Sequence, residues 1–154
     1  YRTRLKLINE IAEVVDFGWS LPHHELWDEH LYYRLSGRGA SMNEAVYKKS
    51  ELLKAGGYFR LPFAWGSDDV TFLRAALISG VISCNSTFVE WRRHDAQISS
   101  GNNWQQNLKR TLCNLLPIYQ EYIDSNNPSI IPKKLLRKTL SLKALEYKKS
   151  LGIK

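Results

Sequence analysis

The stretch Trp65-Gly66-Ser67-Asp68-Asp69-Val70-Thr71-Phe72-Leu73-Arg74 decides the fold of this chain. Ser67 is a good N-cap, and apolar residues recur behind it at helical spacing, so the sequence predicts a helix over Asp68–Ser79 that ends at Gly80. The following segment, Val81–Trp91, is rich in β-branched and aromatic residues and predicts a strand. We therefore expect an α/β fold, in which a few short strands pack with helices.

The segments upstream of this stretch predict further short elements. Apolar residues at helical spacing indicate a first helix that stops near Gly18, and these residues are Leu5, Ile8, Ala12 and Val15. The run Leu31–Leu35 predicts a short strand. Glu51–Ala55 predicts a short helix that Ser50 caps and Gly56 ends.

The last third of the chain predicts two helices. Leucines and tyrosines at helical spacing define a long amphipathic helix from Trp104 to Tyr122, which residues 125–128 break. Lys133–Lys149 predicts a second, basic helix. We expect residues 1–103 to form the α/β unit and residues 104–154 to form a basic helical tail.

The tail carries the net charge of +7. Residues 1–104 contain 12 Lys/Arg and 12 Asp/Glu, whereas residues 105–154 contain 10 Lys/Arg and 3 Asp/Glu. The neutral body disfavours nucleic acid as the partner. The basic tail predicts peripheral contact with an anionic membrane, because its last helix also has an apolar side, formed by Leu136, Leu140 and Leu145. The alternative is that these leucines pack on the body and the lysines are solvated.

Three further features of the sequence limit which class of protein this chain can belong to. No apolar run approaches the roughly 20 residues of a membrane span. Cys84 and Cys113 lack metal-ligand spacing and lie in apolar segments, so we expect buried thiols in a reducing compartment. His23-His24-Glu25 and His30 do not share a helical face, which favours a solvated loop over a metal site.

The adjacent carboxylates Asp68 and Asp69 open the predicted helix. Acidic residues in a first helical turn are commonly plain partners of the helix dipole. A carboxylate held beside an aromatic loop can also take the proton from a sugar hydroxyl, as a general base does. The residues alone leave both interpretations open.

Three further features fit a site around these carboxylates. Gly56-Gly57 permits a close backbone approach, although such a pair is also an ordinary helix C-cap. Trp65 offers an aromatic surface for a sugar, or a side chain for the core. Arg92, Arg93 and His94 end the predicted strand, where arginines suit phosphates and histidine suits a metal, but the same residues also suit a solvated strand end.

Together, the Gly-Gly-Tyr turn, the Gly-Ser-Asp-Asp helix start and the Trp-Arg-Arg-His strand end resemble the acceptor half of a family-two nucleotide-sugar glycosyltransferase, which has the A-type fold. The similarity spans roughly residues 40–100. Asp68 takes the position of the family's catalytic Asp, Ser67 stands where the family has Glu, and Asp69 is an alternative base. The resemblance further implies that His94 helps to hold Mg²⁺ or Mn²⁺, and that the donor and acceptor contacts are Gly56, Gly57, Trp65, Arg92 and Arg93.

The implied activity is an inverting transfer of a sugar from a nucleotide-sugar donor to a glycan or lipid-linked acceptor, in bacterial surface polysaccharide synthesis. The implied location is the cytoplasm, at the inner face of the membrane. The family's amino-terminal half, with its Asp-x-Asp metal motif, is not found in these residues, so we expect the chain to need that half as a partner and to be inactive without it. The alternative, from a different class, is a non-catalytic interaction domain that works through its basic helical tail.

Overall fold

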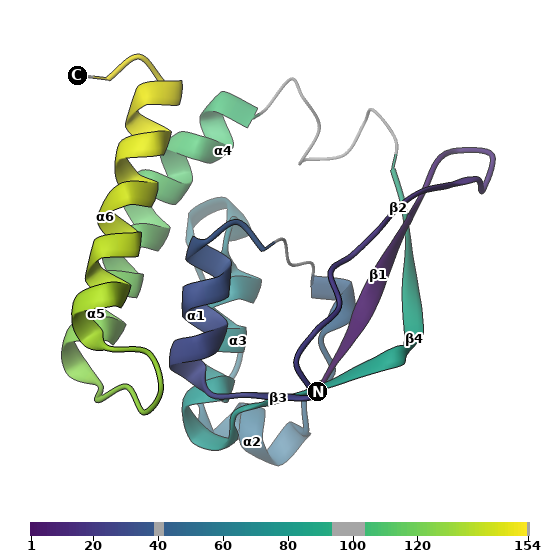
Figure 1. Cartoon of the computed structure of the whole chain (residues 1–154), viewed down its shortest axis with the longest axis horizontal. Coiled ribbons are helices and arrows are strands. Elements are labelled where there is room, and N and C mark those ends of the chain that lie inside the picture. Colours follow the sequence, from purple (N-terminus) through teal and green to yellow (C-terminus); the bar gives the residue numbers. More distant parts are fainter. Residues whose placement is uncertain (39–41, 94–103, 154) are drawn as a thin grey trace.

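The computed structural model describes residues 1–38, 42–93 and 104–153 (Figure 1). The strands are β1 (Arg2–Ile8), β2 (Val14–Phe17), β3 (His24–Glu25) and β4 (Val81–Arg92). The α-helices are α1 (Trp27–Leu35), α2 (Lys49–Lys54), α3 (Ser67–Ser79), α4 (Trp104–Arg110), α5 (Leu116–Ser125) and α6 (Lys133–Ser150). Short 3₁₀ turns lie at Met42–Glu44 and Pro62–Ala64, and a π-helical turn, Thr111–Leu115, joins α4 to α5. The chain is therefore a mixed α/β protein, as the sequence predicts.

The strands in the described part of the chain form one mixed sheet with the order β2-β1-β4-β3. β1 and β4 run parallel, with Arg2 opposite Ser83 and Ile8 opposite Arg92. β2 and β3 pair antiparallel with β1 and β4 at the two edges. Parallel neighbours need a long connection, and here that connection contains α1, α2 and α3.

The prediction of a helix at the start of the chain is wrong, because β1 and β2 form a hairpin there. Asn9 builds the turn: its Oδ1 accepts the backbone N–H groups of Ile11 and Glu13, at 3.1 and 2.8 Å. Ala12 completes the turn with φ at +67°. The apolar spacing that resembled a helix crosses this turn, where Asn9 offers the backbone a local alternative to helical hydrogen bonds.

The predicted strand at Leu31–Leu35 is also wrong, because these residues form the second half of α1. Trp27, Leu31 and Leu35 are buried on one helical face. The carboxylate of Glu29 accepts the N–H of Leu26 at 3.0 Å and stabilises the first turn. A five-residue window was too short to show this periodicity.

The other predicted elements are confirmed. α3, β4 and α6 lie where the sequence places them, and α4, the π-helical turn and α5 together form the predicted long helix. The caps differ from the prediction. Gly66, with φ at +79°, precedes α3, and the Oγ of Ser67 instead accepts the N–H of Leu61 at 2.9 Å. Ser50 lies inside α2, whose N-cap is Lys48.

The main hydrophobic core lies between the helices. It joins α1, α3 and the start of β4 to α5 and α6, and its most deeply buried members are Leu31, Val70, Leu73, Ile123 and Leu136. Asp28 of α1 also fixes the approach to α6, because its Oδ2 accepts the N–H groups of Ile130 and Ile131 at 2.6 and 2.7 Å. The two last helices therefore share one core with the preceding α/β elements.

The thiols do not lie where the sequence predicts. Cys84 and Cys113 are free, but both are exposed rather than buried. Cys84 follows the alternation of β4, in which Val81 and Ser83 take the buried face and leave Cys84 on the outer one. A search for membrane-crossing helices over the described residues finds none with the required length and hydropathy.

Candidate functional site

The carboxylate pair lies in the first turn of α3, where the helix dipole favours negative charge. Asp69 pairs with Arg34 of α1, whose Nη2 lies 2.7 Å from Oδ1 and 2.8 Å from Oδ2. These side chains are only 15% and 18% exposed, so water screens their attraction weakly. Burial opposes the charge on Arg34, but its interactions with Asp69, Tyr119 and Glu44 together outweigh burial and raise the pKa of Arg34. Asp69 therefore acts as a fixed anion that joins α3 to α1.

Asp68 has a different environment from its neighbour. Over the described parts of the chain, its carboxylate makes no ion pair and no side-chain hydrogen bond, and it accepts only backbone N–H groups at Asp68 and Asp69. Burial raises the pKa of Asp68, and the negative charge of Asp69 raises it further. A carboxylate with a raised pKa and no cation in contact is the better proton acceptor of the two.

Tyrosines from separate segments lie within electrostatic reach of this pair. Tyr47 and Tyr58 pack edge to face, with ring centroids 6.2 Å apart. Burial raises the pKa of both phenols, and the charge of Asp68 contributes to both shifts. Tyr119 of α5 is buried, and burial together with the charges of Asp69 and Asp68 raises its pKa well above the usual value. The start of α3 therefore has an aromatic, partly dehydrated surrounding.

The Gly56-Gly57 turn follows α2 and packs against α3. Both glycines have left-handed backbones, with φ at +86° and +74°. A Cβ on Gly56 would collide with Nη2 of Arg74, a residue of α3. A Cβ on Gly57 would meet no atom within 4 Å. Both positions therefore need glycine for the backbone conformation, and Gly56 also needs it for the contact with the helix that carries Asp68.

Trp65 is joined to the tail helices, because its Nε1 donates to Oγ1 of Thr111 at 2.9 Å. The most exposed aromatic ring of this loop is Phe63, at 75% exposure and with φ at +60°. The guanidinium carbon of Arg110 lies 4.2 Å from the ring centroid of Phe63. Sequence reasoning favoured Trp65 and did not select Phe63, since the partner of Phe63 is far along the chain and leaves no local pattern.

The basic end of β4 lies beside the β1–β2 hairpin (Figure 1). Nη1 of Arg92 donates to the carbonyl oxygens of Asn9 and Glu10, at 3.0 and 2.6 Å, and so stabilises the hairpin turn. The backbone N–H of Arg93 continues the pairing with β1 at 2.8 Å. His94 lies outside the described residues. Within residues 1–38, 42–93 and 104–153, no three His, Cys, Asp or Glu side chains form a group that fits a metal ion.

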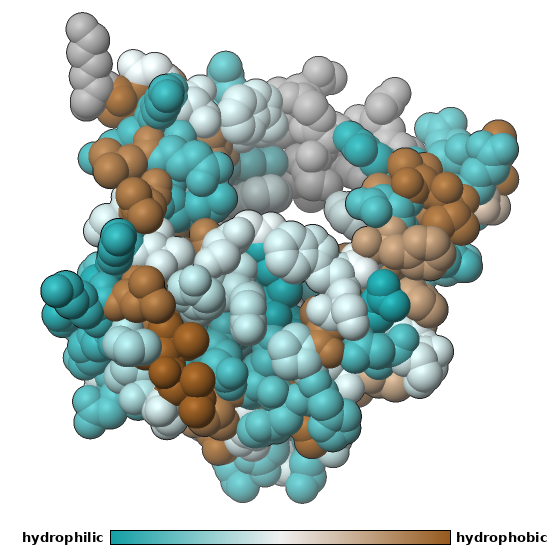
Figure 2. Space-filling view, viewed as in Figure 1, coloured by the Kyte–Doolittle hydropathy of each residue, from teal (hydrophilic) through white to brown (hydrophobic). Residues whose placement is uncertain are grey.

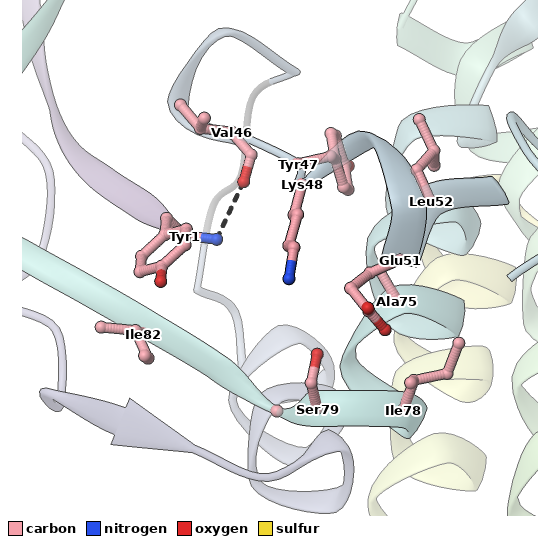
Figure 3. A pocket seen from close by; sticks show the side chains of 11 residues that line it. Tyr1, Val46, Tyr47, Lys48, Glu51, Leu52, Ala75, Ile78, Ser79 and Ile82 are labelled. Carbon is pink, nitrogen blue, oxygen red and sulfur yellow. Dashed lines mark hydrogen bonds between the residues drawn. The ribbon is translucent and has the colours of Figure 1, made fainter. Parts of the chain in front are cut away.

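A pocket of about 380 Å³ opens between α2, the end of α3 and the start of β4. Figure 3 shows Lys48 and Glu51 beside this space, and the amino group of Tyr1 donating to the carbonyl of Val46 at 2.9 Å. Its other lining is mainly apolar and comes from Leu52, Ala75, Ile78 and Ile82. Tyr47 also lines the pocket, and its pKa responds to both Asp68 and Asp69. The volume is in the range of small-molecule sites.

Sequence reasoning missed a buried ionic cluster around Glu25. The predicted solvated loop is wrong for Glu25 and His30, which are 0% and 3% exposed, although His23 and His24 are exposed. Nη2 of Arg2 lies 2.9 Å from Oε2 of Glu25, and Nη2 of Arg38 lies 3.0 Å from the same oxygen. Because Arg2, Glu25 and Arg38 come from distant segments, no local spacing predicts the cluster.

The titration of this cluster follows from its geometry. Burial opposes ionisation of Glu25, but hydrogen bonds from His30 and Arg38 and the charges of Arg2 and Arg38 outweigh it and lower the pKa of Glu25 to about 2. Burial, with the charges of Arg38 and Arg2, lowers the pKa of His30 to about 4. Nδ1 of His30 lies 3.0 Å from Nη2 of Arg38 and 3.6 Å from Oε2 of Glu25, so the same ring nitrogen faces both partners. The cluster joins β1 and β3 to α1.

No protein-family model, curated protein or solved structure matches this chain. Function is therefore inferred from the site geometry and from the residues themselves.

Proposed function

We propose that this chain supplies the acceptor side of a nucleotide-sugar-dependent glycosyltransferase, with Asp68 as the general base. One observation carries the proposal: two adjacent carboxylates at one helix start have different environments. Asp69 is neutralised by Arg34, whereas Asp68 has no cationic partner in the described chain and a raised pKa. In this arrangement Asp68 is available for proton transfer, and Asp69 holds the start of α3 against α1 through its ion pair with Arg34.

The proposed reaction is a direct displacement. The acceptor hydroxyl oxygen forms a bond to the anomeric carbon of the donor sugar, the bond from that carbon to the diphosphate oxygen breaks, and the diphosphate leaves with the bonding electron pair. The hydroxyl proton passes to the carboxylate of Asp68. Attack from the face opposite to the leaving group inverts the configuration, in agreement with the family that the sequence resembles.

The other proposed contacts come from three further segments of the chain. Gly56, which packs on Arg74 of α3, forms one proposed wall together with the adjacent Gly57, and Trp65 forms another beside the tail helices. Arg93 is assigned to the donor phosphates because a guanidinium group matches phosphate geometry. Arg92, the other expected phosphate contact, instead donates to the carbonyl oxygens of Asn9 and Glu10 in the hairpin turn. The family also uses Mg²⁺ or Mn²⁺, with His94 as the expected ligand. The described residues contain no group that fits the ion, so no step is assigned to it.

The proposed acceptor is a glycan or a lipid-linked glycan, as in bacterial surface polysaccharide synthesis. The pocket beside Tyr47 is lined by the last turns of α3, and Asp68 in the first turn is not among its lining residues, so no acceptor contact is assigned to this pocket. The proposed location is the cytoplasm, where the unpaired thiols Cys84 and Cys113 stay reduced.

The deciding experiment compares Asp68→Asn with Asp69→Asn in an assay of nucleotide-sugar turnover on the full-length gene product. Asp68→Asn keeps the shape and removes the base, so we expect kcat to fall by about 10²–10⁴ with an unchanged melting temperature. Asp69→Asn breaks the ion pair with Arg34, so we expect a lower melting temperature as well. Full activity of Asp68→Asn would refute the assignment of the base.

A further inference from the structure

The outward side of α6 carries leucines that the core does not use. Leu136 and Leu140 face inward and are 0% and 5% exposed, which confirms that these two leucines of the predicted apolar side pack on the body. Leu135, Leu142 and Leu145 face solvent, at 38%, 56% and 61% exposure. Figure 2 shows apolar side chains in brown among hydrophilic ones in teal along the side that α6 occupies in Figure 1. The predicted apolar side is thus divided between two faces.

The lysines beside these leucines are not engaged in ion pairs. Lys134, Lys138, Lys148 and Lys149 are exposed, and no carboxylate in the described parts of the chain pairs with them. The nearby acidic groups are already used: Asp124 pairs with Arg137 at 2.6 Å, and Glu146 pairs with Lys143 at 3.0 Å. The helix therefore presents an uncompensated positive charge.

We propose that this outer face of α6, formed by Leu135, Leu142 and Leu145 with Lys134, Lys138 and Lys149, docks on the surface of an anionic lipid bilayer. The helix would lie parallel to the surface. Leucines enter the boundary between headgroups and acyl chains, while the lysine stems reach along them and place their ammonium groups at the lipid phosphates. The proposal does not depend on the glycosyltransferase assignment.

The residue pattern favours a bilayer over other occupants. A second copy of α6 would use the stripe with the spacing 135, 138, 142, 145 and 149, which places Lys138 and Lys149 inside the seam against like charges. Nucleic acid would be recognised through phosphates and bases, and three exposed leucines add nothing to such contacts. A bilayer uses both kinds of side chain, since it offers anionic headgroups above an apolar layer.

Vesicle co-sedimentation of the full chain tests the proposal. The probes are phosphatidylcholine vesicles with or without phosphatidylglycerol, at low and at physiological salt, and duplex DNA is the competing polyanion. We expect binding only to the anionic vesicles, weakened by salt. Lys138→Gln with Lys149→Gln should lower the partition coefficient by about 25-fold, at roughly fivefold for each lysine. Leu142→Ser with Leu145→Ser should also lower it, although the charge is unchanged.

The matched control is Lys49→Gln with Lys54→Gln, which removes the same charge from α2. This pair should leave vesicle binding near the wild-type level, and thermal melting should show that all variants fold. Four results would overturn the proposal: no binding to anionic vesicles at low salt, equal binding to neutral vesicles, an equal loss in the α2 control, or full vesicle binding by the leucine variant. Dimerisation through α6 or preferential binding of DNA would instead assign the face to those partners.

Discussion

The helical region and the strand region of this protein bury their apolar side chains to different extents. α1, α3, α5 and α6 enclose one core, in which Leu31 and Leu136 are 1% and 0% exposed. In the β1–β2 hairpin, Val14, Val15 and Phe17 are 47%, 57% and 50% exposed. Figure 2 shows the corresponding apolar patch over the hairpin. Apolar side chains of the β1–β2 hairpin therefore stay in contact with water, whereas those of the helices are buried against one another. We expect most of the free energy of folding to come from the helical region.

The Glu25 cluster joins the two regions, so its disruption should have the largest effect on stability. Glu25→Gln removes the anion shared by Arg2 and Arg38 and leaves these two buried cations without that partner. We expect the free energy of unfolding to fall by about 3–5 kcal/mol, measured by urea denaturation. Glu10→Gln, an exposed carboxylate of the hairpin, is the control and should change it by less than about 0.5 kcal/mol. Equal effects would show that the cluster does not join the regions.

A pair of truncations compares the two regions directly. Leu136→Ala opens a cavity in the helical core and should cost about 2–5 kcal/mol in the free energy of unfolding. Val15→Ala on β2 removes atoms that already contact water, so we expect a change within about 0.5 kcal/mol. Chemical denaturation of both variants measures the difference. A large cost for Val15→Ala would mean that the strand region is covered in solution.

The pH dependence of stability should show a smaller step that belongs to His30. Because burial lowers the pKa of His30 from 6.5 to about 4, the unfolded chain binds a proton below pH 6.5 that the folded chain does not. Stability should therefore fall by about 2–3 kcal/mol as the pH drops from 6.5 to 4, since one pKa unit corresponds to about 1.4 kcal/mol. The contribution of Glu25, whose pKa is lowered from 4.5 to about 2, is lost at lower pH, between 4.5 and 2.

The variant His30→Gln separates these two steps. It should remove the loss between pH 6.5 and 4 and keep the one below pH 4.5, as followed by thermal melting across the pH range. An unchanged profile would show that His30 does not titrate in this range.

The elements that the sequence predicts well are long and have one clear period. α3, β4 and α6 extend over enough residues for their apolar spacing to show, and Gly80 marks the junction between α3 and β4. The predictions for the segments that form the hairpin and α1 were wrong. The apolar spacing in Leu5–Val15 and in Leu31–Leu35 is ambiguous because these windows are short. For the candidate site, the sequence selects the acidic pair and the resemblance favours Asp68, but the different environments of Asp68 and Asp69 depend on Arg34, which belongs to α1.

The sequence by itself determined the mixed fold class, the two last helices and the concentration of positive charge on them. These properties depend on composition and on contacts between neighbours along the chain. Only the tertiary structure decided which carboxylate has a cationic partner, that Glu25 is buried between two arginines, and that Leu136 faces the core while Leu142 faces solvent. Each of these outcomes is fixed by the packing of segments distant in the sequence, and local periodicity contains no information on such contacts.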